Sequence, residues 1–234
     1  MIEKPLNTAG TLFIVPTPIG NLDDLSPRSV KTLENVDLVA SEDTRKTGIL
    51  LSKLSLKKPL IRADEFKIMQ ASKTIIEHLN LGEDVAFVTD AGTPCISDPG
   101  NRLVAICRDQ GYSVIPLPGP SAVSTALSVC GLKGESFLFL GFLAKKGKLR
   151  SKALEYFVNF PDPIVFFESA KRVEKTLYVL ADLCPEKQIF MAREMSKTYE
   201  EYQLGSAASL LKTIKTRPGN LKGELTLILG SPAL

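Results

Sequence analysis

The first half of the chain alternates short apolar runs with longer amphipathic stretches. Runs rich in β-branched and aromatic residues predict strands over residues 11–16, 38–40, 60–62, 85–89 and 114–117. Apolar residues at helical spacing between them predict helices over residues 28–36, 44–54, 68–81, 101–110 and 121–129. The fourth strand is continuously apolar, as a central parallel strand buried on both faces should be. Strands that alternate with helices in this way predict a parallel α/β sheet with right-handed crossovers.

The pattern changes beyond residue 132, where turn residues become denser. Strands are predicted over residues 136–142, 164–167, 188–192, 199–204 and 224–229, with 199–204 as an edge strand. Helices are predicted over residues 151–157, 170–183 and 207–215. We therefore expect two α/β domains, residues 1–132 with a parallel sheet and residues 133–234 with a mixed sheet.

Composition supports a globular protein and narrows the possible partners only slightly. Hydrophobic residues make up 44% of the 234 residues and charged residues 24%, which excludes a mainly disordered chain. The net charge of +3 permits a nucleic-acid partner but does not by itself indicate one. No apolar run reaches the roughly 18 residues of a membrane span, and the first residues lack a signal-peptide core. We expect a cytoplasmic protein without a membrane segment.

Cysteine and histidine usage excludes several kinds of site. The four cysteines form no C-x-x-C pair and His78 is the only histidine, so a zinc site has too few ligands and we expect no metal. Catalysis by a Ser-His-Asp or Cys-His arrangement would require His78, which lies in an amphipathic run and is better explained as a helix-surface residue.

Three predicted strand exits are rich in glycine, proline and small polar residues: 16–21, 90–100 and 118–122. Ligands of parallel α/β sheets bind at the carboxyl ends of the strands, where prolines stiffen a loop and glycines let a ligand approach the backbone. The chain has neither G-x-x-x-x-G-K-[ST] nor G-x-G-x-x-G, and Asp90 and Asp98 would repel a phosphate. These loops favour a zwitterionic or cationic ligand such as S-adenosylmethionine (SAM). Tight turns without a ligand are the alternative.

Motifs in both halves of the chain carry a family resemblance. The first half contains FIVPTPIGNL (13–22), SEDTR (41–45), VTDAGTP (88–94), ISDPG (96–100) and PGPSA (118–122). The second half contains FLGFL (139–143), FFES (166–169), ARE (192–194) and KGE (222–224). In this order and spacing the motifs resemble the ribosomal RNA small subunit methyltransferase I family, a branch of the tetrapyrrole (cobalt-precorrin type) methylases. The resemblance covers about residues 10–230.

The resemblance implies a two-domain, non-Rossmann methyltransferase that binds SAM in a cleft between its domains, usually as a homodimer. It implies methylation of the ribose 2′-hydroxyl of a decoding-centre cytidine in 16S rRNA of the small ribosomal subunit. Carried over residue by residue, the cofactor site comprises Thr17, Pro18, Gly20, Asp90, Ala91, Gly92, Thr93, Ser121, Ala122, Phe167, Glu168, Leu225 and Thr226. Members of the family usually continue for some tens of residues past the final strand, whereas this chain stops at Leu234. We therefore expect rRNA recognition to rest on the two core domains or on a dimer.

The segment after the second predicted strand offers candidates for catalysis. A ribose hydroxyl is a poor nucleophile, so a base or hydrogen-bonding carboxylate helps its methylation. Our hypothesis is that Glu42 or Asp43 polarises the hydroxyl while Arg45 binds a neighbouring phosphate. The alternative is structural, because acidic residues at a helix N-terminus are stabilised by the helix dipole.

The basic segment Lys145–Arg150, after the predicted strand 136–142, is the best candidate for phosphate binding. A solvated helix start would also explain it, and Glu194 could be a pocket carboxylate or part of an ion pair. The candidate RNA-binding residues are Arg45, Lys145, Lys146, Lys148, Arg150, Lys171 and Arg172.

Two other functions remain open at this stage. A small-molecule methylase acting on a tetrapyrrole would use the same fold and cofactor, with cations for the carboxylates of its substrate. A non-catalytic assembly factor would bind rRNA without transferring a methyl group.

Overall fold

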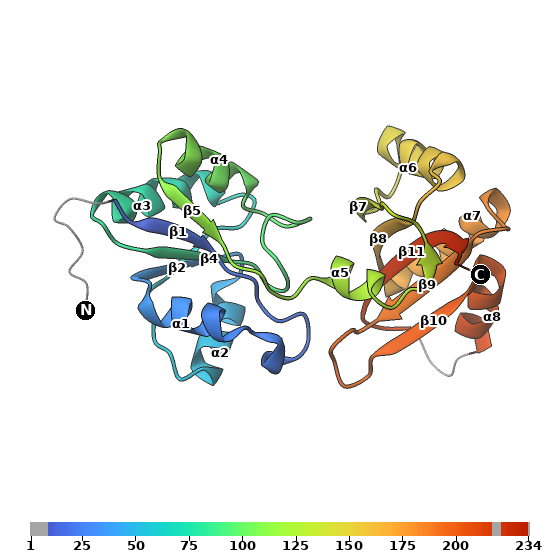
Figure 1. Cartoon of the computed structure of the whole chain (residues 1–234), viewed down its shortest axis with the longest axis horizontal. Coiled ribbons are helices and arrows are strands. Elements are labelled where there is room, and N and C mark those ends of the chain that lie inside the picture. Colours follow the sequence, from blue (N-terminus) through green and yellow to red (C-terminus); the bar gives the residue numbers. More distant parts are fainter. Residues whose placement is uncertain (1–8, 217–220, 234) are drawn as a thin grey trace. The chain divides into compact units, whose positions relative to one another are not determined.

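The computed structural model describes residues 9–216 and 221–233. The chain divides between Ser121 and Ala122 into two compact units, each with its own sheet (Figure 1). The predicted domain boundary lies after residue 132, whereas the segment 122–132 packs with the second unit. No helix in the described part of the chain is both long and apolar enough to cross a membrane.

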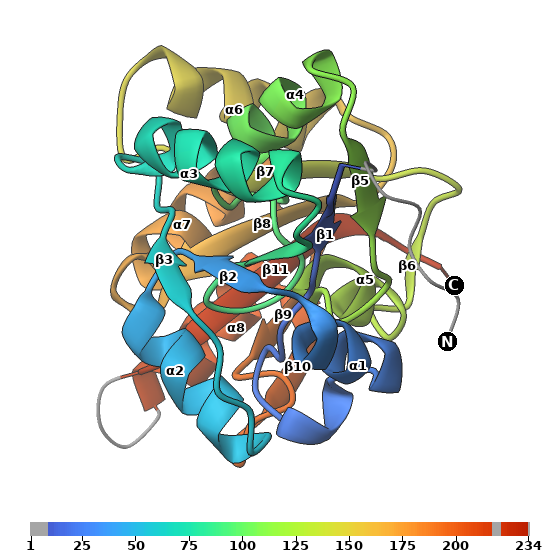
Figure 2. The same cartoon turned by 90° about the vertical axis from the view of Figure 1, so that its left-hand side faces the viewer.

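The first unit contains a five-stranded sheet in the order β3-β2-β4-β1-β5, with every neighbouring pair parallel. Its carboxyl strand ends therefore meet at one edge of the sheet. Figure 2 labels four of these strands, β3, β2, β1 and β5. The strands are β1 (Thr11–Ile14), β2 (Leu38–Ser41), β3 (Leu60–Arg62), β4 (Val85–Val88) and β5 (Ser113–Pro116). The helices are α1 (Pro27–Asn35), α2 (Thr44–Lys53), α3 (Ile68–Asn80) and α4 (Asn101–Asp109), with a short 3-10 turn at Leu22–Asp24.

Local signals in the sequence account for where these helices begin. Ser26 caps α1, its hydroxyl accepting a hydrogen bond from the Ser29 N–H, and Pro27 follows at the first helical position. Asp43 caps α2 by accepting from the Arg45 N–H. Helices α3 and α4 cover one face of the sheet and α1 and α2 the other (Figure 1), which explains why β2 and β4 are buried throughout.

The second unit contains a six-stranded mixed sheet in the order β10-β9-β11-β8-β7, with β6 paired to β11. Only the β7–β8 pair is parallel. The strands are β6 (Leu132–Lys133), β7 (Leu138–Phe142), β8 (Ile164–Ser169), β9 (Gln188–Arg193), β10 (Glu201–Ser206) and β11 (Glu224–Pro232). The helices are α5 (Ala122–Leu127), α6 (Lys148–Asn159), α7 (Ala170–Leu183) and α8 (Ala207–Thr216). The predicted fold class, a parallel sheet followed by a mixed sheet, is confirmed.

Two boundaries in this unit differ from the prediction. Helix α6 begins at Lys148 rather than at residue 151, so half of the basic segment is helical. Strand β6 has only two residues and was not predicted, because a pair of residues carries no periodicity. The predicted edge strand is confirmed as β10, which lies at one end of the sheet.

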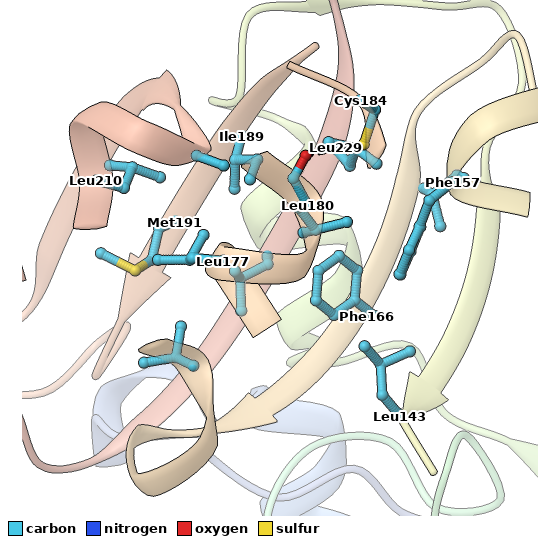
Figure 3. Packing of buried hydrophobic residues seen from close by; sticks show 14 of the residues in the cluster. Leu143, Phe157, Phe166, Leu177, Leu180, Cys184, Ile189, Met191, Leu210 and Leu229 are labelled. Atoms are coloured by element: carbon cyan, nitrogen blue, oxygen red, sulfur yellow. Dashed lines mark hydrogen bonds between the residues drawn. The ribbon is translucent and has the colours of Figure 1, made fainter. Parts of the chain in front are cut away.

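The core of the second unit lies between its sheet and helices α6, α7 and α8 (Figure 3). Phe157 of α6 and Phe166 of β8 are fully buried, with ring centroids 5.1 Å apart. Leu177 and Leu180 of α7 pack in the same cluster. Truncating either phenylalanine to alanine would cost about 3–5 kcal/mol of folding free energy. The cluster contains residues of the sheet and of all three helices, and it therefore holds these helices against one face of the sheet.

Candidate functional site

Two loops at the carboxyl edge of the first sheet are joined through their backbones. Thr17, after β1, and Gly92, after β4, exchange two N–H···O bonds of 2.9 Å each. The Thr17 hydroxyl also donates to the carbonyl of Thr89 at 3.0 Å, and Thr17 is buried. Gly92 has a φ of +82°, a conformation that favours glycine. The predicted loops 16–21 and 90–100 therefore form one rigid edge.

The third predicted loop, after β5, joins the same edge. The Thr93 hydroxyl donates to the carbonyl of Pro120 at 3.0 Å. A Cβ on Gly119 would lie 2.7 Å from the Cβ of Pro16, so the approach of these two loops requires glycine. The structure thus brings together the first-unit members of the predicted cofactor set. Among them Gly20 and Ala91 are exposed, and Pro18 and Ser121 are half-buried. Ala122, the next member of the set, belongs to the second unit, where it opens α5.

Asp90 lies at the centre of this edge, and its two carboxylate oxygens have different surroundings. One oxygen receives a hydrogen bond of 2.6 Å from the Lys46 ammonium of α2. The other is buried and has no hydrogen-bond partner among the residues that the structure describes. A buried acceptor without a donor is costly, so this oxygen is suited to a ligand that donates, such as an ammonium group.

Glu42 and Asp98 lie close enough to Asp90 for the three carboxylates to repel one another. Burial raises the pKa of Glu42, and the charge of Asp90 raises it further. Burial, followed by the charge of Glu42, raises the pKa of Asp98 to about 6. A carboxylate whose pKa is raised binds a proton more tightly, which suits it to accept one in a reaction.

Asp43 has the opposite character, although it is the next residue in the chain. Hydrogen bonds from the Arg45 side chain, at 3.0 and 2.7 Å, are the main reason that its pKa lies well below its usual range. The same carboxylate caps α2. Arg45 is exposed, but its guanidinium is engaged with Asp43. These contacts fit the structural alternative for Asp43 and leave Glu42 as the stronger candidate base.

The second-unit members of the predicted cofactor set lie side by side on β8 and β11. Thr226 is paired with Phe167, and Leu225 with Glu168. Because successive strand residues point to opposite faces, Phe167 and Thr226 share one face. Leu225 belongs to the core on the other face, beneath the helices.

The carboxylate of Glu168 accepts hydrogen bonds from three other residues of the second unit. It is buried, and its oxygens accept from the Thr176 hydroxyl at 2.8 Å, the Ser169 N–H at 2.8 Å and the Arg172 guanidinium at 2.6 Å. Breaking a buried pair of this kind costs about 3–5 kcal/mol. Arg172 is therefore required by the fold as the charged partner of Glu168, because its removal would leave a buried carboxylate without that partner.

The basic residues of the second unit fall into an exposed and a bound group. Lys145, Lys146, Lys148 and Lys171 are exposed. The guanidinium of Arg172 donates to the Leu143 carbonyl at 3.0 Å, and that of Arg150 to the Ala144 carbonyl at 3.3 Å. These bonds hold the loop between β7 and α6 beside the start of α7, so the two predicted basic stretches are neighbours.

Other groups noted in the sequence have structural roles or show no ligand set. Glu194 forms an ion pair of 2.9 Å with Lys197 and accepts from the Glu224 N–H, which confirms the ion-pair interpretation. A Cβ on Gly223 would lie 2.6 Å from the Glu194 side chain. Among the described residues there is no group of three or more His, Cys, Asp or Glu side chains that could hold a metal ion.

Lys46 is the member of this edge that sequence reasoning missed. Its partner Asp90 is 44 positions away, so pairing could not be inferred from local spacing. The available signal was its position in the first turn of α2, four residues after Glu42.

Comparison with known proteins gives consistent results at the level of sequence families. A family model described as Tetrapyrrole (Corrin/Porphyrin) Methylases matches residues 11–211. A protein of Escherichia coli O157:H7 named "Ribosomal RNA small subunit methyltransferase I" is 41% identical over 224 residues, covering 95% of this chain and 78% of the relative. The protein of that name from Thermotoga maritima is 42% identical over 221 residues, covering 94% of this chain and 98% of the relative.

Solved structures with low sequence identity share the fold. A cobalt precorrin-4 methyltransferase aligns with a TM-score of 0.68 at 15% identity, covering 94% of each chain. The uroporphyrin-III C-methyltransferase of Thermus thermophilus, described as complexed with S-adenosylhomocysteine, aligns with a TM-score of 0.65 at 17% identity, covering 94% of this chain and 97% of that chain.

Proposed function

The chain belongs to the ribosomal RNA small subunit methyltransferase I family, a branch of the tetrapyrrole methylases, and from this premise we propose its reaction and substrate. It is a SAM-dependent methyltransferase. Its substrate is 16S rRNA in the small ribosomal subunit, and it methylates the ribose 2′-hydroxyl of the decoding-centre cytidine at position 1402 in the usual rRNA numbering. The observation that carries the proposed chemistry is the half-buried Glu42 beside the interlocked loops of the first unit.

The residues at this edge fit the proposed cofactor. When bound, SAM supplies an electrophilic methyl group on its sulfonium, together with an ammonium and a carboxylate. The buried oxygen of Asp90 is an acceptor for the ammonium, and the rigid backbone of residues 90–93 offers fixed donors and acceptors. For the second unit, the proposal carries over Phe167 and Thr226 as contacts through their shared face.

Glu42 is proposed to take the proton of the ribose hydroxyl. Its raised pKa makes it a better proton acceptor than an ordinary surface glutamate. SAM would supply the methyl group through cleavage of its sulfonium S–C bond and would leave as S-adenosylhomocysteine, while Glu42 takes the proton of the hydroxyl. The neighbouring Asp98 is a second carboxyl group with which Glu42 can share that proton. Alignment of the hydroxyl with the methyl carbon supplies the remaining acceleration, a proximity effect worth several kcal/mol.

The exposed lysines of the second unit are proposed to bind rRNA phosphates. Lys145, Lys146 and Lys148 stand in one segment with Lys171 nearby, and each neutralised phosphate adds salt-dependent affinity. Following the family resemblance, we also propose that the enzyme acts as a homodimer in the cytoplasm, where small subunits are found.

A transfer assay with tritiated SAM tests this proposal. Three substrates are compared side by side: small subunits that lack the modification, naked 16S rRNA and a tetrapyrrole precursor. We expect label in RNA, in the subunits or in the naked rRNA. Label confined to the tetrapyrrole would overturn the substrate assignment. Cofactor binding without transfer to any substrate would favour a non-catalytic assembly factor.

A further inference from the structure

A bulge in β7 gathers three phenylalanine rings on one face of the second sheet. Phe139 is paired with Val165 and Phe142 with Phe167, so β7 advances by three residues over the stretch in which β8 advances by two. In a regular strand, residues three apart would point to opposite faces. The extra residue of the bulge, with Gly141 at a φ of +62°, turns Phe142 back to the side of Phe139.

The resulting cluster is well ordered but leaves one ring open to solvent. The ring of Phe167 lies 5.1 Å from that of Phe139 in an edge-to-face arrangement and 5.3 Å from that of Phe142. Phe142 is nevertheless 61% exposed. A single exposed apolar side chain is common, but here a bulge and two supporting rings hold the exposed ring in a fixed place.

The residues that follow Phe142 connect it to the positively charged segment Lys145–Arg150. Leu143 is buried in the core beneath the helices (Figure 3), and its carbonyl accepts the 3.0 Å bond from Arg172. Phe142 therefore stands at the end of an anchored strand. The exposed Lys145, Lys146 and Lys148 begin three residues further on.

We propose that Phe142 is a stacking platform for an unpaired base of the RNA substrate, with the lysine segment binding the phosphates beside that base. Aromatic rings next to a basic groove are the usual means of binding single-stranded RNA. The charge of the segment favours a polyanion over a second copy of this chain. This inference rests on the proposed function, because it names the surface that recognises the same RNA substrate.

The absence of tryptophan from the sequence makes this surface directly observable. In a Phe142→Trp variant the single indole reports stacking by a loss of fluorescence when a base lies on it. The matched control is Phe137→Trp, at a position 51% exposed just before β7. The probe is a single-stranded RNA of about ten nucleotides, within the usual range of binding-site sizes. We expect strong quenching at position 142 and little at position 137.

Three results would overturn the inference. Equal quenching at both positions would mean non-specific association. Quenching of the position-142 indole by S-adenosylhomocysteine alone would assign the ring to the cofactor. A fluorescence change that depends on protein concentration without RNA would assign it to self-association.

Kinetics provide a second, independent test. Loss of stacking in Phe142→Ala should raise KM for the RNA substrate about tenfold or more, with the affinity for SAM unchanged. Phe142→Tyr, which keeps the ring, should retain most of the wild-type KM. An unchanged KM in Phe142→Ala would refute the inference while wild-type transfer to the RNA still supports the proposed function. Specific quenching without methyl transfer by the wild type would instead refute the function alone.

Discussion

Glu42 and Asp43 are adjacent in the sequence, yet their surroundings give the two carboxyl groups different chemistry. Asp43 is bound by its own helix and by Arg45, which keeps it ionised and occupied. Glu42 is half-buried near Asp90, and both effects raise its pKa. At the scale of single residues, therefore, environment and not residue type decides which group can accept a proton.

Replacing each carboxylate by its amide separates these roles. We expect Glu42→Gln to lower kcat for methyl transfer about a hundredfold, the usual size of a general-base contribution, with SAM affinity retained. Asp43→Asn should keep most of the activity, because asparagine also caps helices. The measurement is single-turnover transfer to RNA over a range of pH. Wild-type turnover in Glu42→Gln, or a larger loss in Asp43→Asn, would contradict the assignment.

Asp98 offers a test of the electrostatics that does not depend on catalysis. Its pKa is about 6 in the folded protein against an ordinary value of 3.8, so the folded state binds the proton more tightly. The contribution of Asp98 to the stability of the wild type should therefore fall as the pH rises from about 4 to 6. Asp98→Asn removes this loss and should stabilise the protein at pH 7.5 by about 1 kcal/mol after allowance for solvent screening.

Urea denaturation of both proteins at pH 7.5 and at pH 4.5 measures the effect. The gain from Asp98→Asn should shrink at the lower pH, where the wild-type carboxyl group is protonated. A variant that is less stable than the wild type at pH 7.5 would show that Asp98 is stabilised in its charged form.

At the scale of elements, a loop glycine and a helix glycine of the first unit differ in whether the structure leaves room for a side chain. Gly100 precedes α4 with a φ of +128°, and a Cβ there would lie 2.4 Å from the ring of Phe87. Gly48 lies inside α2, where the nearest atom to a new Cβ is a leucine methyl at 3.8 Å. The first glycine is required by the conformation of the 90–100 loop, which belongs to the candidate site, and the second is not required by packing.

Alanine substitutions at the two glycines should therefore change stability in opposite directions. We expect Gly100→Ala to destabilise the protein by about 2–5 kcal/mol through backbone strain and overpacking. Gly48→Ala should stabilise it by about 0.5–1 kcal/mol through helix propensity. Thermal unfolding of both variants decides this, and a neutral Gly100→Ala would show that the 90–100 loop is not rigid.

If the basic segment binds RNA phosphates, the RNA affinity of the protein should depend on the salt concentration. Replacing Lys145, Lys146 and Lys148 by glutamine should weaken RNA binding. It should also lower the slope of log affinity against log salt by about 2, because each lost phosphate contact removes roughly 0.7 from the slope. The matched control is glutamine at Lys53, Lys57 and Lys67, lysines of the first unit that also carry exposed charges. Equal slopes in the two triple variants would show that the segment does not contact phosphate.

At the scale of the whole molecule, local patterns and long-range pairing were predictable to different degrees. The parallel sheet followed from apolar runs between capped helices, and the three glycine- and proline-rich loops met at one edge because parallel strands end together. The Lys46–Asp90 bond and the bulge at Gly141 depend on partners in other elements. Neither leaves a periodic signal in the sequence.

The central claim is that this chain methylates a ribose hydroxyl of small-subunit rRNA. The most direct test is to incubate small subunits lacking the modification with enzyme and SAM, digest the RNA, and identify the methylated nucleoside by mass spectrometry. We predict 2′-O-methylcytidine as the product, with its yield strongly reduced in Glu42→Gln. A methyl group on a base, or no methylated nucleoside while a tetrapyrrole is methylated, would contradict the claim.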